Sequence, residues 1–172
     1  MRNILILLAI LSPNIMLGQK QPIEKILKAH FTNLNYIECN YKQEKEISML
    51  NEPLISTGIF KYEKDGDISW EQHMPFKEIF LINGKSDNTF DKHIKQFVMS
   101  ILTGDILNDT KLAVSYSEGE QSYIVVITPK KGAMKKKLEE IILTFHKEIV
   151  TLSKLEIILQ NGDVSIITFF DN

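Results

Sequence analysis

Residue types that commonly bind metals or catalyse reactions are few and widely spaced in this chain. Its four histidines are His30, His73, His93 and His146, and its only cysteine is Cys39. None of them is separated from another by two or three residues, a spacing typical of zinc ligands. The sequence therefore predicts no metal site.

Motifs for nucleophilic catalysis and nucleotide binding are absent as well. The chain contains no G-x-S-x-G, no G-x-x-x-x-G-K-[ST] and no G-x-G-x-x-G. Asp65 and Asp67 flank Gly66, where carboxylates suit either paired acid and base chemistry or local hydrogen bonds to a turn. The turn is the more common arrangement, so we predict no catalytic residue, no enzyme activity and no cofactor.

Trp70 offers a different chemistry, because an indole presents a large apolar surface with one hydrogen-bond donor. Trp70 could therefore line an apolar ligand site or pack in the hydrophobic core. Strand patterns at residues 54–64 and 68–74 meet around it, and the Asp65-Gly66 pair between them predicts a tight hairpin. The residues expected on one shared face are Phe60, Tyr62, Ile68, Trp70 and Met74.

The other patterns predict strands covered by helices. Apolar residues at helical spacing predict amphipathic helices at residues 22–34 and 91–104, with a short helical turn near 133–138. The expected strands are 36–49, 54–64, 68–74, 77–83, 111–117, 122–129, 141–147, 150–160 and 164–171. Helices and strands do not alternate regularly, so the predicted fold class is mainly β with covering helices (α+β), a curved antiparallel sheet.

The run from Pro53 to Lys85 resembles a known family. It has a small residue, a glycine, an aromatic-x-Tyr pattern, a charged turn, a tryptophan, a proline and an apolar run that ends in Asn-Gly-Lys. This order is similar to that of the periplasmic lipoprotein carriers of the LolA family, and Tyr41-Lys42-Gln43 stands where that family has an aromatic-x-Gln pattern. The resemblance implies a half-barrel with a helical lid. The chain is shorter than the family after Lys85, so a hairpin is expected to be missing.

The resemblance also assigns roles to residues. An acyl-chain cavity would be lined by Phe60, Tyr62, Ile68, Trp70 and Met74. The lid would present Ile26, Leu27, Phe31, Ile94, Phe97, Val98 and Ile101. Lys64 stands where the family often has an arginine that holds the lid shut; a solvated lysine is the alternative, and lysine lacks the planar fork of arginine.

Five lysines crowd a short segment near residue 133. They are Lys130, Lys131, Lys135, Lys136 and Lys137. Such a run is usually a solvated face, and the alternative is a docking surface for an acidic partner or an anionic lipid layer.

The amino terminus has the layout of a secretory signal peptide. Arg2 precedes an apolar run, Ile4 to Leu11, that is too short to span a bilayer. We expect cleavage near Gly18, a periplasmic product and one domain over residues 19–172.

With 19 lysines against 22 acids after cleavage, the balance argues against nucleic-acid binding. Cys39, alternating with Ile37 and Tyr41, is expected to be a small buried residue rather than a reactive thiol.

These observations favour a monomeric periplasmic carrier that moves acylated lipoproteins from the inner to the outer membrane. Its partners would be lipoproteins or other lipid cargo, with inner-membrane donor and outer-membrane acceptor proteins. One alternative is a periplasmic sensing or assembly module that binds a lipidated partner without transport. The other, an enzyme acting on lipid or polymer, would need a nucleophile and base that the sequence does not offer.

Overall fold

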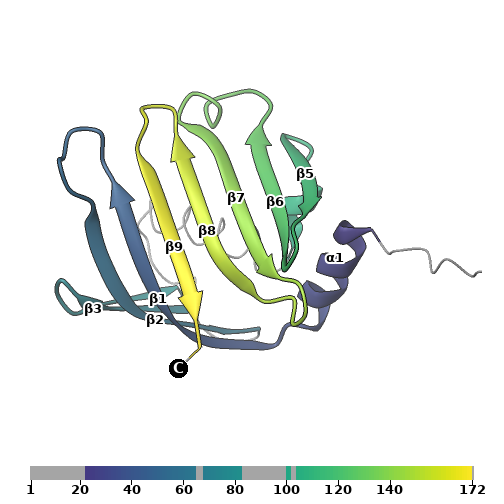
Figure 1. Ribbon diagram of the computed structural model, residues 1–172, viewed down its shortest axis with the longest axis horizontal. Coiled ribbons are helices and arrows are strands. Elements are labelled where there is room, and N and C mark those ends of the chain that lie inside the picture. The colour runs from purple at the N-terminus through teal and green to yellow at the C-terminus, as the bar shows by residue number, and fades with distance from the viewer. Residues whose placement is uncertain (1–21, 65–67, 83–99, 102–103, 172) are drawn as a thin grey trace, which may run out of the picture.

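The structure, a computed structural model, describes residues 22–64, 68–82, 100–101 and 104–171. Its strands form one antiparallel sheet in the order β4-β3-β2-β1-β9-β8-β7-β6-β5 (Figure 1). The strands are β1 (Tyr36–Glu46), β2 (Leu54–Glu63), β3 (Ile68–Met74), β4 (Glu78–Ile82), β5 (Leu112–Glu118), β6 (Ser122–Pro129), β7 (Leu138–His146), β8 (Leu152–Leu159) and β9 (Val164–Phe170). Because β1 pairs with β9, the first and last strands lie side by side in the middle of the sheet. The predicted antiparallel sheet is confirmed.

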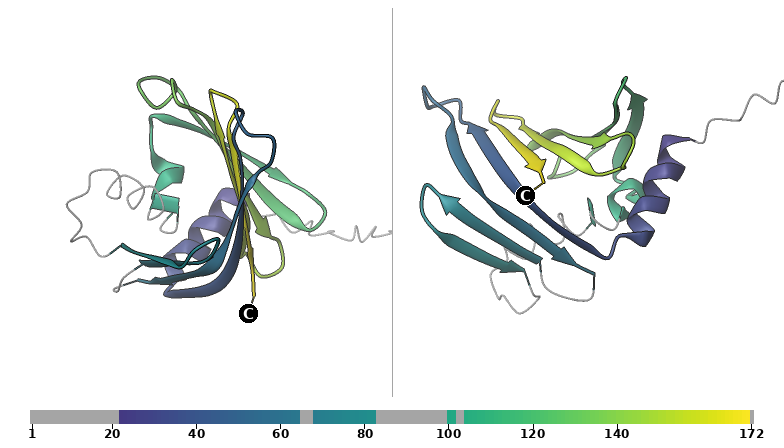
Figure 2. Two further views of the ribbon diagram at one scale, coloured as in Figure 1. Left: turned by 90° about the vertical axis from the view of Figure 1, so that its left-hand side faces the viewer. Right: turned by 60° about the horizontal axis from the view of Figure 1, so that its bottom comes forward.

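The sheet is strongly curved, with one concave and one convex face (Figure 2). Every second residue of a strand points to the same face. In β6 this places Tyr123, Val125 and Ile127 in the core, where each is buried. The concave face is therefore the apolar face that needs a cover.

The helix α1 (Ile23–Asn33) supplies part of that cover. Its apolar stripe buries Leu27 and Phe31, and the Phe31 ring meets the ring of Phe145 on β7 edge to face, with centroids 5.8 Å apart. The helix lies across one end of the concave face (Figure 2). The amphipathic pattern of residues 22–34 is thus explained by packing on the sheet.

The second expected helix falls largely outside the described residues. Of its range, 91–104, the structure describes Ser100 and Ile101, which are helical, and Gly104. The Asp65-Gly66 turn and the hairpin expected to be missing after Lys85 also lie outside them. A 3₁₀ helix, η1 (Asp105–Asn108), was not predicted. Residues 133–137 form hydrogen-bonded turns.

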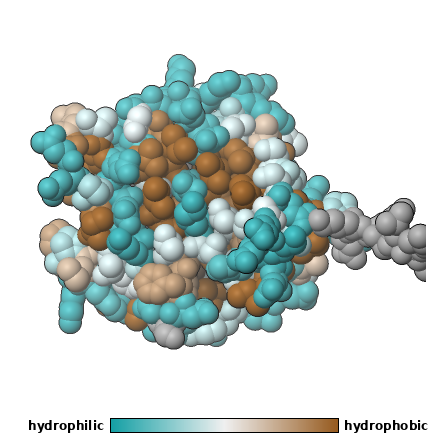
Figure 3. Space-filling view, viewed as in Figure 1, coloured by the Kyte–Doolittle hydropathy of each residue, from teal (hydrophilic) through white to brown (hydrophobic). Residues whose placement is uncertain are grey.

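The convex face alternates apolar and charged side chains, and Figure 3 shows this mixture. Glu156 on β8 lies between Ile142 on β7 and Ile166 on β9. Its carboxylate pairs with the Lys154 ammonium at 2.8 Å. The outward-facing isoleucines of β7 and β9 are therefore separated by a charged residue of β8.

Gly58 is fixed by close backbone contact at a bulge between β2 and β3. A Cβ atom there would lie 1.8 Å from the Glu71 carbonyl oxygen and 2.9 Å from the Tyr41 ring. A backbone oxygen in a paired strand cannot move aside as a side chain can. The position therefore admits only glycine.

We expect Gly58→Ala to lower the free energy of unfolding by at least about 2 kcal/mol, as overpacking does elsewhere. Gly119→Ala is the control, because its added Cβ would meet mainly the Ser122 hydroxyl, a movable group. Denaturant unfolding measures both. Equal stability of the two variants would contradict the contact at Gly58.

Candidate functional site

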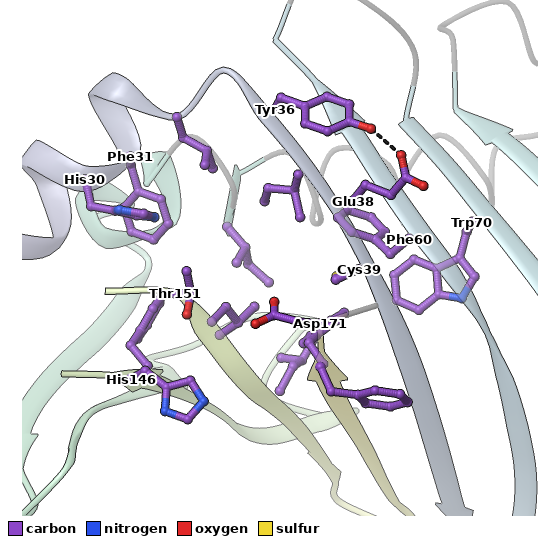
Figure 4. Close-up of a pocket in the computed structure, with 18 residues that line it drawn as sticks. His30, Phe31, Tyr36, Glu38, Cys39, Phe60, Trp70, His146, Thr151 and Asp171 are labelled. Atoms are coloured by element: carbon purple, nitrogen blue, oxygen red, sulfur yellow. Dashed lines mark hydrogen bonds between the residues drawn. The ribbon is translucent and has the colours of Figure 1, made fainter. Parts of the chain in front are cut away.

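A pocket of about 490 Å³ lies between α1 and the concave face (Figure 4). Its described lining is His30, Phe31, Leu34, Tyr36, Ile37, Glu38, Cys39, Phe60, Trp70, Ile101, Phe145, His146, Thr151, Leu152, Leu155, Phe169, Phe170 and Asp171. These residues come from the end of α1, the start of β1 and the ends of β7 and β9, with β2, β3 and β8 behind them. Most of the lining is apolar.

The pocket opens at a seam in the sheet. The pairing of β1 with β9 stops at Asn40 and Phe170, so the first residues of β1, Tyr36 to Cys39, have only β2 beside them. Asp171, just past the end of β9, lines the pocket together with Cys39 (Figure 4). β1 thus extends past the end of β9, and this unpaired part of β1 is the seam.

Aromatic rings form the deep wall. Trp70 packs against Phe60 with centroids 5.2 Å apart and against Phe169 at 6.5 Å. The Tyr41 ring lies 4.9 Å from Trp70 on the other side. Rings that brace one another in this way hold a fixed apolar surface.

Polar groups gather at the mouth. The Tyr36 hydroxyl donates a hydrogen bond to the Glu38 carboxylate (Figure 4), and the Lys61 ammonium lies 3.6 Å from that carboxylate. The Tyr36 bond and the Lys61 charge lower the pKa of Glu38. With Asp171 nearby, the mouth carries two carboxylates. Burial lowers the pKa of His30, which favours a neutral imidazole.

Cys39 lies half-buried in the pocket wall. Burial, then the charges of Asp171 and Glu38, raise the pKa of its thiol to about 11. A thiol of this kind stays protonated near neutral pH and is a poor nucleophile.

The residues expected to line a cavity divide into three groups. Phe60 and Trp70 line the pocket. Tyr62 and Ile68 are cross-strand partners in the core, 3% and 2% exposed, outside the pocket's described lining. Met74 is 62% exposed.

The placement of Met74 on the Ile68 and Trp70 face was wrong. The pairing of β2 with β3 shifts between Thr57 and Gly58, so Gln72 pairs with Gly58 and Met74 with Thr57. The extra residue, His73, reverses the alternation beyond it.

The expected lid residues are also distributed unevenly. Phe31 and Ile101 line the pocket, and Leu27 is wholly buried beneath α1. Ile26 lines a second, shallower depression beside Val150. Ile94, Phe97 and Val98 lie outside the described residues.

Lys64 contacts the carboxyl end of α1. Its ammonium donates to the Thr32 carbonyl oxygen in the last turn of α1 at 3.2 Å, and its backbone N–H donates to the Asn35 carbonyl at 2.9 Å. A cation suits the free carbonyls at a helix carboxyl end.

Sequence reasoning missed the far side of the pocket, which β7, β8, β9 and residues next to them supply: Phe145, Thr151, Leu155, Phe169 and Asp171. The available signal was the apolar run at 166–170, which alternation alone assigns to no particular partner. Within the described ranges, no cluster of three or more histidine, cysteine or acidic residues is placed to hold a metal.

The curved antiparallel sheet with a helix laid over an apolar pocket is a half-barrel α+β fold. The chain belongs to the LolA family, because residues 32–172 match the family model described as outer membrane lipoprotein carrier protein LolA. No helix in the described part of the chain has the length and apolar character needed to cross a bilayer.

Solved structures similar to this chain have low sequence identity. A LolA superfamily protein, NE2245 from Nitrosomonas europaea, is 8% identical, with 86% of this chain and 91% of that chain covered and a TM-score of 0.40. MucB, in complex with MucA(peri), is 12% identical, with 86% and 53% covered and a TM-score of 0.49. A DUF1329 family protein from Desulfovibrio piger is 9% identical, with 86% and 90% covered and a TM-score of 0.35. No curated protein sequence matches the chain.

The raised pKa of Cys39 predicts slow alkylation. We expect iodoacetamide to react with the folded, reduced protein at a rate that keeps rising up to about pH 11. The denatured protein should level off near the ordinary thiol pKa of about 8.5. Mass spectrometry of timed samples measures both rates. A folded protein that reacts as fast as the denatured one at pH 8 would contradict the buried thiol.

Proposed function

We propose that this protein is a periplasmic carrier that shields the acyl chains of lipoproteins in the pocket beneath α1 and moves them from the inner to the outer membrane. The observation that supports this is the apolar pocket itself, which combines an aromatic wall with a seam through which a chain can leave. Transfer of each methylene from water into such a pocket contributes about 0.8 kcal/mol.

The polar groups at the pocket mouth favour a cargo that carries no negative charge near its acyl chains. Asp171 would repel a carboxylate or phosphate held at the seam, whereas the charge of Glu38 is paired with Lys61. The oxygens of both carboxylates can accept hydrogen bonds from an amide. A lipidated peptide presents amide N–H groups where its acyl chains end. The pocket therefore favours such a cargo over a free fatty acid.

Opening of the cover would involve α1. The helix buries Leu27 and Phe31 against the sheet and packs Ile23 and Ile26 beside them. Lys64 bonds to its last turn. Export would follow from the amino-terminal segment, with cleavage near Gly18 and the domain at 19–172. Amino-terminal sequencing of the exported protein tests this; a product that retains Met1 would contradict it.

Filling the pocket should weaken cargo binding. Cys39→Phe places a ring in the lining, and Asn40→Phe, its control, adds the same ring on the opposite face of β1. We expect the first variant to bind a fluorescent acyl probe with a neutral head group at least about tenfold more weakly, because the ring displaces several methylenes. The control should bind as the parent does. Emission of Trp70, the only tryptophan, reports binding independently.

Equal binding by both variants would contradict the assignment of the pocket. Transport needs a separate experiment: the loaded protein is incubated with an acceptor membrane, and the released lipoprotein is measured. Stable one-to-one complexes that never release cargo would favour a sensing or assembly module instead of a carrier.

Removal of the Lys64 ammonium should loosen α1. We expect Lys64→Met to speed amide hydrogen exchange in the last turn of the helix about fivefold, since an exposed hydrogen bond contributes about 1 kcal/mol. Lys61→Met is the control, because Lys61 pairs with Glu38 and Glu71 and not with the helix. Unchanged exchange in Lys64→Met would show that the contact does not hold the lid.

A further inference from the structure

Three turns form a continuous edge at the end of the sheet opposite the pocket mouth. They are residues 47–52 between β1 and β2, 130–137 between β6 and β7, and 160–163 between β8 and β9, named here the turn rim. Figure 1 shows them along the upper edge of the sheet, and the same edge is mainly hydrophilic in Figure 3.

Hydrogen bonds join the three turns. The Gln160 backbone N–H donates to the Lys137 carbonyl oxygen at 2.9 Å. The Ser48 backbone N–H and hydroxyl donate to the Asp163 carboxylate at 2.9 and 3.1 Å. The turn rim is therefore one connected surface and not three independent loops.

Positive charge is concentrated on this surface. Five exposed lysines, Lys130, Lys131, Lys135, Lys136 and Lys137, stand against two acids, Glu52 and Asp163, for a net charge of +3 in a chain whose formal net charge is −2. Lys130 donates to the Thr110 carbonyl at 3.1 Å. In the described part of the chain, no carboxylate forms an ion pair with any of the five.

Apolar side chains project from the same turns. Met49 is 92% exposed and Leu50 48% exposed at the tip between β1 and β2. Met134, in the middle of the lysine run, is 48% exposed. A solvated lysine face has no need of large apolar groups at its tips, whereas a lipid surface accepts charge at the head groups and apolar tips beneath them.

We propose that the turn rim docks on a membrane surface that contains anionic lipids. The lysines face the head groups, and Met49, Leu50 and Met134 enter the layer beneath. An acidic protein would satisfy the lysines but gives no reason for apolar tips on two separate turns, so the bilayer is the better match. This inference does not depend on cargo binding, because the pocket mouth lies at the other end of the strands.

The test is flotation of the exported protein with vesicles of phosphatidylcholine alone or with phosphatidylglycerol added. We expect binding only to the anionic vesicles, and loss of binding in 0.5 M salt as the charges are screened. Lys131→Gln/Lys135→Gln/Lys136→Gln should bind roughly 100-fold more weakly, from the contribution of each lysine near a charged surface. Lys25→Gln/Lys42→Gln/Lys154→Gln removes the same charge elsewhere and should bind as the parent does.

A Met134→Ser variant tests the apolar part, and we expect its affinity for anionic vesicles to fall several-fold while its melting temperature is unchanged. Equal loss in both triple variants would overturn the proposal, because it would reflect net charge alone. Absence of binding to both vesicle types would also overturn it and would leave an acidic protein as the partner of the lysines.

Discussion

The contact between Phe31 and Phe145 joins the helix to the sheet, and the rest of the binding site depends on it. Phe31 also fills the space beside Gly104, where a Cβ atom would lie 2.8 Å from the Phe31 ring. Leu27, one turn earlier, is wholly buried. Ile23, Ile26 and Leu34 also pack against the core, so α1 is attached along its apolar stripe, and each fully buried side chain contributes about 1.5–3 kcal/mol.

The pocket depends equally on a difference in length between two neighbouring strands. A β9 that continued past Phe170 would pair with Tyr36 to Cys39 and close the seam. Because it ends there, backbone groups of β1 and the carboxylates of Glu38 and Asp171 face an opening with apolar walls on the inner side. The carboxylates and the opening are therefore found at the same place, where the pairing of β9 with β1 stops at Phe170 and Asn40.

The sequence predicted what local alternation determines. Phe60 and Tyr62 share the buried face of β2, and Cys39 lies on the inner face of β1, because side chains in a strand point to opposite faces in turn. Met74 could not be placed in this way, since the bulge before it is a property of the pairing between β2 and β3. The seam could not be predicted for the same reason. It depends on the register of β1 against β9, two strands at opposite ends of the chain, and no local pattern encodes that register.

The charges of the two ends of the sheet differ in sign. Carboxylates stand at the mouth and lysines on the turn rim, although the chain as a whole has a small net charge. An anionic bilayer would attract the rim and repel the mouth, so a molecule docked by its rim would hold the mouth away from the lipid surface. The anionic lipids of that bilayer would then neither reach the pocket nor suit its carboxylates. The separation of the two charges would therefore hold the apolar pocket away from the acyl chains of the membrane on which the rim docks.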